Sequence, residues 1–122
     1  MATDVVDVAV AAATAAVAGA PWVEVSLSDV DDERAVPDGV DLVVLSELLY
    51  YLPAHRVGAV LDRVGAALRP GGDLVLAHWR QWPAEAPADA AQVHDRVLRD
   101  GRFVPLVEHT DESFLLHVVR RR

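Results

Sequence analysis

Residues 40–52 (VDLVVLSELLYYL) and residues 67–76 (ALRPGGDLVL) decide the fold of this chain of 122 residues. The first stretch opens with a nearly continuous apolar run over residues 40–45, which is typical of a strand buried on both faces of a parallel sheet. In the second stretch, Pro70-Gly71-Gly72 predicts the end of a helix, and residues 73–77 predict the next buried strand. Between them, apolar residues recur with the spacing of one helix face, at Val57, Val60, Leu61, Val64 and Leu68. Strand, helix and strand together predict a βαβ unit with parallel strands.

Shorter elements are predicted before this unit. Residues 5–8 are rich in valine and predict a short strand. Residues 9–18 are rich in alanine and predict a helix that ends at Gly19. Residues 22–27 alternate between apolar and polar side chains, which predicts a second strand.

The C-terminal part predicts a helix and a hairpin. We expect the helix over residues 89–99, followed by strands over residues 103–109 and 113–119 that are close enough to pair antiparallel. Pro105 cannot donate a hydrogen bond to a neighbouring strand, so its strand belongs at a sheet edge. The predicted fold class is α/β, with a mostly parallel sheet that ends in an antiparallel hairpin, in one domain over residues 1–122.

The composition narrows the classes of function. The formal net charge of −8 argues against a general affinity for nucleic acid, because phosphate contacts need clustered Lys and Arg. The absence of cysteine excludes disulfides, thiolate nucleophiles and thiolate zinc sites. No apolar run approaches the roughly 20 residues of a membrane-spanning helix, and no secretory signal is visible. We therefore expect a cytoplasmic protein that binds neither nucleic acid nor membrane.

The two stretches quoted first resemble motifs of the class I S-adenosylmethionine-dependent methyltransferases. Residues 40–52 are similar to the fourth strand of these enzymes and the segment after it, and residues 67–76 are similar to the segment before and within the fifth strand. The Ser-Glu-Leu-Leu-Tyr-Tyr-Leu run at residues 46–52 and the triplet His78-Trp79-Arg80 resemble the nodulation-type N-methyltransferases in particular. The resemblance implies a Rossmann-like fold with strand order 3-2-1-4-5-7-6 and S-adenosylmethionine as cofactor.

One part of the family pattern has no match in this sequence. These enzymes begin with a first strand and a Gly-x-Gly-x-Gly loop, where any side chain would block the approach of the backbone to the cofactor. Here residues 6–8 already resemble the second strand, and the sequence has no Gly-rich loop. The resemblance therefore implies a partial fold without the first strand and glycine loop, and weak or absent binding of S-adenosylmethionine by the chain alone. Because the missing strand is central, the other strands would pair directly, stay partly open or recruit a partner, and we expect a homodimer or hetero-complex.

Three residues match the cofactor side of the family pattern. Asp7, in the second-strand match, implies a ligand of the cofactor ribose, because a carboxylate can accept hydrogen bonds from two adjacent hydroxyls. Its alternative is a solvated acid near the terminus. Asp29 follows the third-strand match and implies a contact with the adenine amino group, whereas its alternative is a member of an acidic loop. Ser46 ends a buried strand, where open α/β sheets bind ligands, and its alternative role is to cap a helix.

The candidates for the catalytic, substrate-facing side are Glu47, Tyr51, His78, Arg80 and His94. Methyl transfer from a sulfonium is an in-line displacement, so it depends mainly on the positioning of two reactants, with a base only where the acceptor carries a proton. Glu47 and Tyr51 follow one strand, and His78 and Arg80 end or follow its neighbour, so the four should meet at one sheet edge. His78 and His94 have the alternative of buried histidines with satisfied hydrogen bonds.

We expect the other aromatic side chains to serve mainly in packing, and the histidines to bind no metal. Of Tyr50 and Tyr51, we expect one in the core and one at the rim of a pocket. The tryptophans Trp22, Trp79 and Trp82 are expected to pack against the protein. No two histidines lie four residues apart on one helix, so we predict no metal site.

The predicted function is S-adenosylmethionine-dependent transfer of a methyl group to nitrogen or oxygen of a small or sugar-like substrate, by a chain that is incomplete. Two alternatives remain open. One is a non-catalytic methyltransferase-like remnant or interaction module. The other is one half of a split methyltransferase, whose first strand and glycine loop come from another chain.

Overall fold

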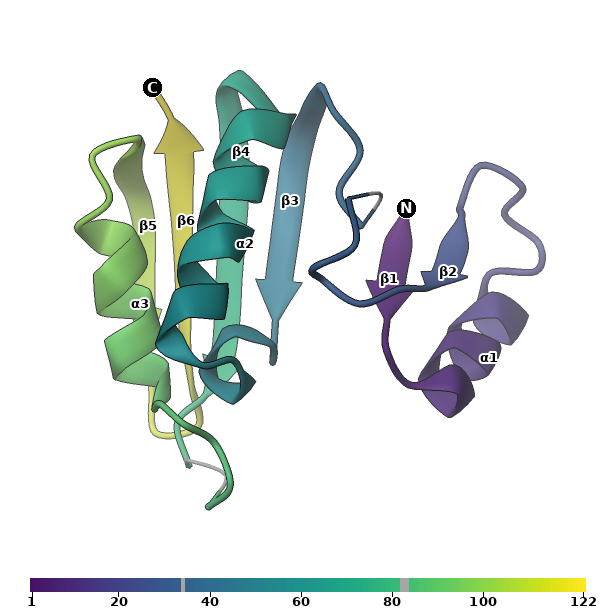
Figure 1. The fold of residues 1–122 in the computed structure, drawn as a ribbon, viewed down its shortest axis with the longest axis horizontal. Coiled ribbons are helices and arrows are strands. Elements are labelled where there is room, and N and C mark those ends of the chain that lie inside the picture. The colour runs from purple at the N-terminus through teal and green to yellow at the C-terminus, as the bar shows by residue number, and fades with distance from the viewer. Residues whose placement is uncertain (34, 82–83) are drawn as a thin grey trace. The chain divides into compact units, whose positions relative to one another are not determined.

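The computed structural model describes residues 1–33, 35–81 and 84–122, and these form two compact units, Met1–Pro37 and Asp38–Arg122 (Figure 1). Each unit has its own sheet, of two strands and of four strands respectively. The single domain that the sequence predicts over residues 1–122 stays a prediction.

The N-terminal unit is a small βαβ arrangement. Strand β1 (Ala2–Asp4) leads into helix α1 (Asp7–Ala16), and strand β2 (Val25–Leu27) pairs parallel to β1. Helix α1 buries none of its side chains fully among the described residues, but Ala9, Val10 and Ala13 are partly buried, and its alanines have a high helix propensity.

The first strand lies earlier than the sequence predicts. The Asp4 carboxylate accepts a hydrogen bond from the Val6 N–H (Oδ1···N 2.8 Å), and this local bond turns the chain out of β1. The strand predicted at residues 5–8 is therefore wrong, because residues 2–4 form the strand and Asp7 lies in the first turn of α1.

The C-terminal unit is a four-stranded sheet with the strand order β3-β4-β6-β5. Strand β3 (Val40–Ser46) is parallel to β4 (Leu68–Trp79), which is antiparallel to β6 (Phe114–Arg121), and β5 (Phe103–Thr110) is antiparallel to β6. The 3₁₀ helix η1 (Leu49–Tyr51) and helix α2 (Ala54–Ala67) connect β3 to β4, and helix α3 (Ala90–Leu98) connects β4 to β5. The predicted βαβ unit and hairpin are confirmed, and β5, which contains Pro105, lies at the sheet edge as predicted.

The order of the strands confirms the predicted fold class. The pair β2-β1 and the sheet β3-β4-β6-β5 correspond to strands 3-2 and 4-5-7-6 of the methyltransferase pattern. In the four-stranded sheet only β6 runs against the other strands. The fold is thus a partial Rossmann-like methyltransferase fold, mostly parallel with a C-terminal antiparallel hairpin, without the first strand and glycine loop.

The core of the C-terminal unit lies between the sheet and its two helices. Helices α2 and α3 cover the same face of the sheet (Figure 1). Burial alternates along β3: Val43 and Leu45 are buried, whereas Leu42 and Val44 are each 55% exposed. The prediction that residues 40–45 are buried on both faces is wrong, because the helices of this unit cover one face only.

The start of β4 depends on its two glycines. Helix α2 ends at Ala67, before Pro70-Gly71-Gly72, as predicted. Gly71 has φ +82°, which favours glycine. A Cβ at Gly72 would lie 2.9 Å from the Arg69 carbonyl oxygen and 3.2 Å from that of Asp41, so this position needs glycine for the close approach of β4 to β3.

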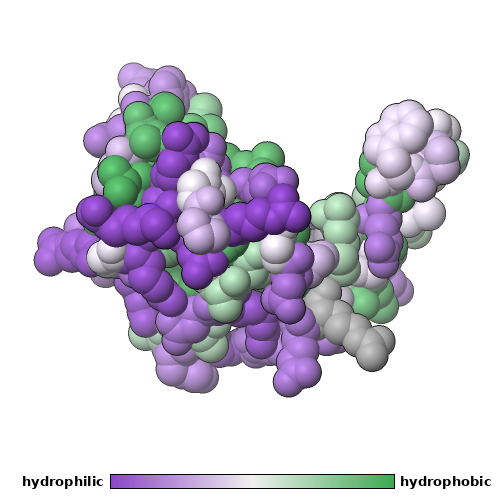
Figure 2. All heavy atoms as spheres, turned by 90° about the horizontal axis from the view of Figure 1, so that it is seen from above, coloured by the Kyte–Doolittle hydropathy of each residue, from purple (hydrophilic) through white to green (hydrophobic). Residues whose placement is uncertain are grey.

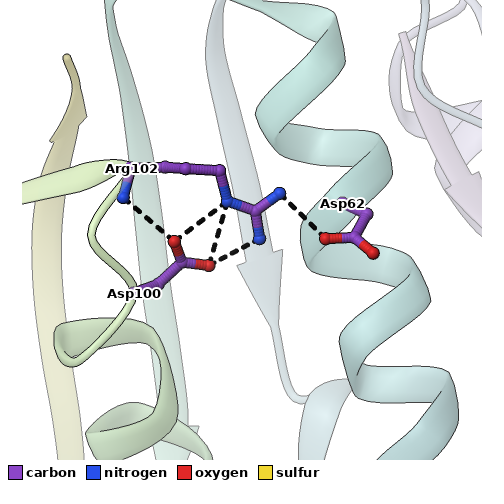
Figure 3. Close-up of polar contacts among 3 residues, drawn as sticks. All are labelled: Asp62, Asp100 and Arg102. Atoms are coloured by element: carbon purple, nitrogen blue, oxygen red, sulfur yellow. Dashed lines mark hydrogen bonds and ion pairs between the residues drawn. The ribbon is translucent and has the colours of Figure 1, made fainter.

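Arg102 connects helix α2 to the loop before β5, at the end of the sheet where β3 begins. Arg102, in the loop before β5, binds Asp100 (Nη2···Oδ2 2.5 Å) and Asp62 of α2 (Nη1···Oδ1 2.9 Å) (Figure 3). The hydrogen bonds from Arg102 lower the pKa of Asp100. In the view of Figure 2, hydrophilic side chains predominate on the C-terminal unit. No helix of the described residues is both long and apolar enough to cross a bilayer.

Candidate functional site

The carboxyl ends of β3 and β4 lie side by side. Ser46 is the register partner of Ala77, and the Glu47 N–H donates to the Ala77 carbonyl oxygen (2.9 Å). Glu47 then adopts φ +52°, the only positive φ of a non-glycine residue among those described. A residue with a Cβ adopts this conformation only at a steric cost. Here the conformation turns the chain from β3 towards η1.

The Glu47 carboxylate connects the two strand ends through its side chain. Its Oε1 accepts the Trp79 backbone N–H (2.6 Å), and its Oε2 accepts a hydrogen bond from the Tyr50 hydroxyl. A carboxylate has about four lone-pair positions, so these two bonds leave acceptor capacity for a ligand. Glu47 is itself exposed, so that capacity is open to solvent.

The two tyrosines after β3 have different environments. Tyr50 is fully buried, as predicted for the tyrosine in the core, and Tyr51 is 50% exposed, whereas its place at a pocket rim stays a prediction. Their rings make an edge-to-face contact with centroids 4.7 Å apart. Burial, followed by the hydrogen bond to Glu47 and its charge, raises the pKa of Tyr50. Tyr50 therefore remains a neutral donor to Glu47, and Tyr51 presents its ring to solvent.

His78 and His94 are buried and bonded to each other. His78 Nε2 accepts the Leu49 backbone N–H (3.1 Å), and His78 Nδ1 lies 2.9 Å from His94 Nε2. Burial lowers the pKa of His78 to about 4, although the Glu47 charge opposes this. Burial, followed by the nearby His78 and His117, lowers the pKa of His94 to about 3. This geometry favours the alternative of buried histidines with satisfied hydrogen bonds.

Arg80 lies where β4 meets the hairpin. Its N–H donates to the Ser113 carbonyl oxygen (2.8 Å), and its guanidinium donates to the Asp111 carbonyl oxygen. The Asp111 carboxylate accepts the N–H groups of Ser113 (2.6 Å) and Phe114 (2.9 Å), which form the turn before β6. The bond from Phe114 and those from His109 and Ser113 lower the pKa of Asp111 to about 2. Arg80 is thus held at the same end of the sheet as Glu47 while its side chain stays exposed.

The predicted cofactor ligands divide between the two units. Asp4 ends β1 and Asp29 follows β2, and the Ser28 N–H donates to the Asp4 carbonyl oxygen (3.0 Å) between them. The position that the resemblance gives to the ribose-binding acid, the carboxyl end of the second strand, is therefore held by Asp4 rather than by Asp7. Asp4 does not stand out in the sequence, because the valines at residues 5–8 predict a strand that would end beyond it.

Ser46 keeps its place at the carboxyl end of β3 in the other unit. The residues at the N-cap positions of the next two helices are Leu48 and Pro53, and neither helix has a side-chain cap. The alternative role of Ser46 as a helix cap is therefore not observed. Its predicted role in cofactor binding stays a prediction.

The tryptophans are less buried than predicted. Trp22 is 81% exposed and Trp79 is 43% exposed, so the packing assignment is wrong for Trp22 and holds only in part for Trp79. Trp82 lies outside the described residues. Among the described residues, no three His, Asp or Glu side chains are arranged to hold a metal ion.

The comparisons with known proteins agree with this geometry. No family model and no curated protein match the sequence. Among solved structures, a protein from Pseudomonas syringae assigned as a methyltransferase is 30% identical, with a TM-score of 0.78 over 98% of this chain and 70% of its own. The N-methyltransferase NodS from Bradyrhizobium japonicum WM9, in complex with S-adenosyl-L-homocysteine, is 23% identical, with a TM-score of 0.81 over 98% of this chain and 64% of its own. The magnesium protoporphyrin IX methyltransferase from Synechocystis PCC 6803, with bound S-adenosylmethionine, has a TM-score of 0.71 at 14% identity over 98% of this chain and 58% of its own.

The strand order, the two strand ends and these similarities define a methyltransferase fold of the Rossmann-like class. The chain belongs to the class I S-adenosylmethionine-dependent methyltransferase family. It spans 70%, 64% and 58% of the lengths of the three similar structures named above.

Proposed function

We propose that this chain takes part in S-adenosylmethionine-dependent methyl transfer to nitrogen or oxygen of a small or sugar-like substrate, and that it supplies the substrate side of the site. One observation carries this proposal. The Glu47 carboxylate is fixed at the carboxyl ends of two adjacent parallel strands, β3 and β4, and the exposed Tyr51 follows the first of them in η1. Open α/β sheets bind their ligands at this edge.

The residues near the two strand ends have chemistry that suits the substrate side. Glu47 can accept a hydrogen bond from an amine or a hydroxyl and orient its lone pair towards the methyl group. Tyr51 offers an aromatic face and a hydroxyl, and Arg80 offers donors for an anionic or hydroxylated substrate. His78 and His94 are both buried, so they support these side chains and do not contact the substrate themselves.

The residues of the N-terminal unit fit one part of the cofactor. Asp4 ends one strand and Asp29 follows its parallel neighbour, where a carboxylate suits the ribose hydroxyls and the adenine amino group. The sequence offers no Gly-x-Gly-x-Gly segment for the methionine part. When bound, the cofactor supplies a methyl group activated by a sulfonium. We therefore propose weak or absent binding of S-adenosylmethionine by this chain alone.

Association is part of the proposal. Strand β3 lies at an edge of its sheet, and its Leu42 and Val44 are exposed. Unpaired strand edges and apolar surface favour pairing with another chain, so we propose a homodimer or a hetero-complex that completes a split methyltransferase. A cytoplasmic location belongs to the same proposal and is supported by the composition.

The test is to supply the segment that the family pattern lacks. A first strand and glycine loop, taken from the Pseudomonas syringae relative, would be fused to the chain or co-expressed with it. Transfer of labelled methyl from S-adenosylmethionine to a panel of small amines and amino sugars is then measured. Methyl transfer supports the proposal, whereas a folded restored protein that binds the cofactor and methylates none of the panel contradicts it and favours a non-catalytic interaction module.

The site assignment has its own variants in the restored protein. Three variants, Glu47→Gln, Tyr51→Phe and Arg80→Gln, each remove one charged group or hydroxyl of the proposed site. For each we expect kcat/KM to fall at least tenfold, which corresponds to ~1.4 kcal/mol in the activation barrier. Asp62→Asn is the matched control, because Asp62 lies on α2 with a side chain 75% exposed, in an ion pair with Arg102. Equal activity of all four variants contradicts the site assignment.

A further inference from the structure

Five aromatic and imidazole rings form a continuous line through the C-terminal unit. The line runs from His117 of β6 through His94 of α3 and His78 of β4 to Tyr50 and Tyr51 of η1. Successive ring centroids are 4.9, 4.9, 5.0 and 4.7 Å apart, and every contact is edge-to-face. The first four side chains are buried, and the line ends at Tyr51, which is exposed.

The three histidines in this line are also joined by hydrogen bonds. His78 Nδ1 lies 2.9 Å from His94 Nε2, and His94 Nδ1 lies 2.7 Å from His117 Nδ1. At one end, His78 Nε2 is bonded to the Leu49 N–H (3.1 Å). At the other end, His117 Nε2 lies 3.9 Å from Glu108 Oε1, on a side chain 74% exposed, and has no hydrogen-bond partner among the described residues.

The direction of every bond follows from the Leu49 amide. A backbone N–H can only donate, so His78 Nε2 is an acceptor and the proton of the neutral ring is on Nδ1. His78 Nδ1–H then donates to His94 Nε2, which leaves the proton of His94 on Nδ1. His94 Nδ1–H donates to His117 Nδ1, so the proton of His117 is on Nε2 and points towards Glu108.

The direction of these hydrogen bonds excludes two other roles for the histidines, those of a general base and of a proton relay. A general base needs a lone pair directed at the substrate proton, and both ring nitrogens of His78 and of His94 are already engaged. A proton relay needs a group at each end that can gain and lose a proton. The Leu49 amide does neither near neutral pH. The hydrogen bonds therefore fix the orientation of the histidine rings and do not relay a proton.

The bonded amide lies in the segment that carries the proposed site. Leu49 begins η1, and the N-cap residue Leu48 offers no side-chain cap to the first N–H groups. His78 therefore supplies from β4 the acceptor that η1 itself lacks. The Glu47 bond to the Trp79 N–H attaches the same segment to the next residue of β4 (2.6 Å). Without the acceptor on His78, the Leu49 N–H would lose this bond, whereas the bonds of Glu47 to Ala77 and Trp79 would remain.

We propose that His94 and His117 are positioning residues, which fix the tautomer of His78 and thereby hold η1 so that Glu47 and Tyr51 face the ligand. The identity of that ligand rests on the proposed function, whereas the bonded line of histidines can be tested without any ligand. Neither His94 nor His117 touches a reacting atom in this scheme.

The first measurement is the tautomeric state of each histidine in the full chain, by long-range ¹H–¹⁵N correlation spectra at neutral pH. We expect the proton on Nδ1 of His78, on Nδ1 of His94 and on Nε2 of His117. The opposite tautomer at any of the three, or rapid exchange between tautomers, contradicts the inference. This measurement needs no substitution and therefore stands whether or not the variants fold.

The second measurement compares two variants of the last histidine. His117→Asn keeps an acceptor near the position of Nδ1, and His117→Leu removes it at similar volume. We expect exchange of the Leu49 amide to accelerate at least about tenfold in His117→Leu relative to His117→Asn, with the amide of Val64 in α2 unchanged between them. Equal acceleration of both amides in His117→Leu indicates a loss of global stability only and contradicts a positioning role. If His117→Leu does not fold, His117→Ala in the same comparison replaces it.

The two proposals fail in different ways. Absence of methyl transfer with the predicted tautomers present contradicts the proposed function alone. Other tautomers, or a Leu49 amide that does not respond to the loss of the acceptor, contradict the positioning role alone.

Discussion

The carboxylate of Glu47, which follows β3, accepts the backbone N–H of Trp79 at the end of β4 at 2.6 Å. This bond continues the pairing of two parallel strands through a side chain, after the backbone of Glu47 has turned away at φ +52°. The same carboxylate is a candidate for contact with the substrate. One residue thus fixes the geometry of the strand ends and offers acceptor capacity at the edge where ligands bind.

The backbone conformation of Glu47 leads to a first prediction. Glu47→Ala and Glu47→Gly both lose the carboxylate and its two hydrogen bonds, so both should be less stable than the parent. Glycine adopts a positive φ without the steric cost of a Cβ, so Glu47→Gly should be more stable than Glu47→Ala by about 1 kcal/mol. Denaturant unfolding of the two variants measures this difference. An alanine variant as stable as the glycine variant would show that the turn relaxes in solution.

The environment of Tyr50 gives a second prediction. Its pKa is raised by burial and by the Glu47 carboxylate, so in the folded state it ionises only above the usual range of tyrosine. Because the folded pKa exceeds the unfolded value, the stabilisation is present below pH 10.0 and is lost as pH rises above it. In Tyr51→Phe, the only tyrosine left is Tyr50, and we expect its phenolate absorbance to appear only as the protein unfolds in alkali. Phenolate absorbance that appears before unfolding would contradict the buried bond.

The buried histidines give a third prediction, on acid stability. The pKa values of His78 and His94 are lowered to about 4 and about 3, from 6.5 in the unfolded chain. Below pH 6.5 the unfolded state therefore binds more protons, and stability falls with pH through about 4 and then about 3. Between about pH 7.5 and about pH 5, we expect the free energy of unfolding to fall by on the order of 2–4 kcal/mol.

The control for this prediction is a matched pair of substitutions, measured by denaturant unfolding at both pH values. His94→Gln removes one buried imidazole and should reduce the loss by about half, although it lowers stability at both pH values. His55→Asn removes an exposed histidine and should leave the loss unchanged. A parent protein equally stable at the two pH values would contradict the assignment of buried neutral rings.

The elements of the C-terminal unit could be predicted because their signals are local and strong. Residues 57–68 repeat apolar side chains with helical spacing, and Pro70-Gly71-Gly72 stops the helix regardless of its surroundings. Strand β1 could not be predicted from the same kind of signal. Its three residues, Ala2–Asp4, have neither an apolar run nor alternation, and the valines that follow them have a higher strand propensity.

The exposure of β3 and the histidine line depend on tertiary structure. An apolar run does not show which face a helix will cover, so the sequence alone predicts burial for Leu42 and Val44 as well. His78 and His94 are 16 residues apart in sequence, and His94 and His117 are 23 apart, so no local pattern reports their bonds. The sequence does predict that Glu47, Tyr51, His78 and Arg80 follow or end two neighbouring strands. That placement follows from topology alone.

The exposed side chains of β3 lead to a prediction on association. If the edge of β3 pairs with another chain, then Leu42→Thr together with Val44→Thr should reduce association and preserve strand propensity. Light scattering should show a dimer for the parent and a larger share of monomer for the double variant. Val8→Thr is a control, because Val8 is 73% exposed on α1. A monodisperse parent monomer that finds no partner would contradict this proposal.

The position of Asp4 leads to the last prediction, which separates two acids three residues apart. Asp4 ends β1 beside β2, at the edge where parallel strands present ligand-binding groups, whereas Asp7 lies in the first turn of α1 with its Oδ1 bonded to the Val8 N–H (2.7 Å). In the protein restored with a first strand and glycine loop, Asp4→Asn should weaken binding of S-adenosylmethionine at least about tenfold in calorimetric titration, because two ribose hydroxyls would lose a charged acceptor. Asp7→Asn should bind like the restored parent, and the unrestored chain should bind weakly or not at all. Low-micromolar binding by the unrestored chain would show that the glycine loop is dispensable. Weaker binding by Asp7→Asn but not by Asp4→Asn would show that Asp7, in the first turn of α1, makes the ribose contact instead of Asp4.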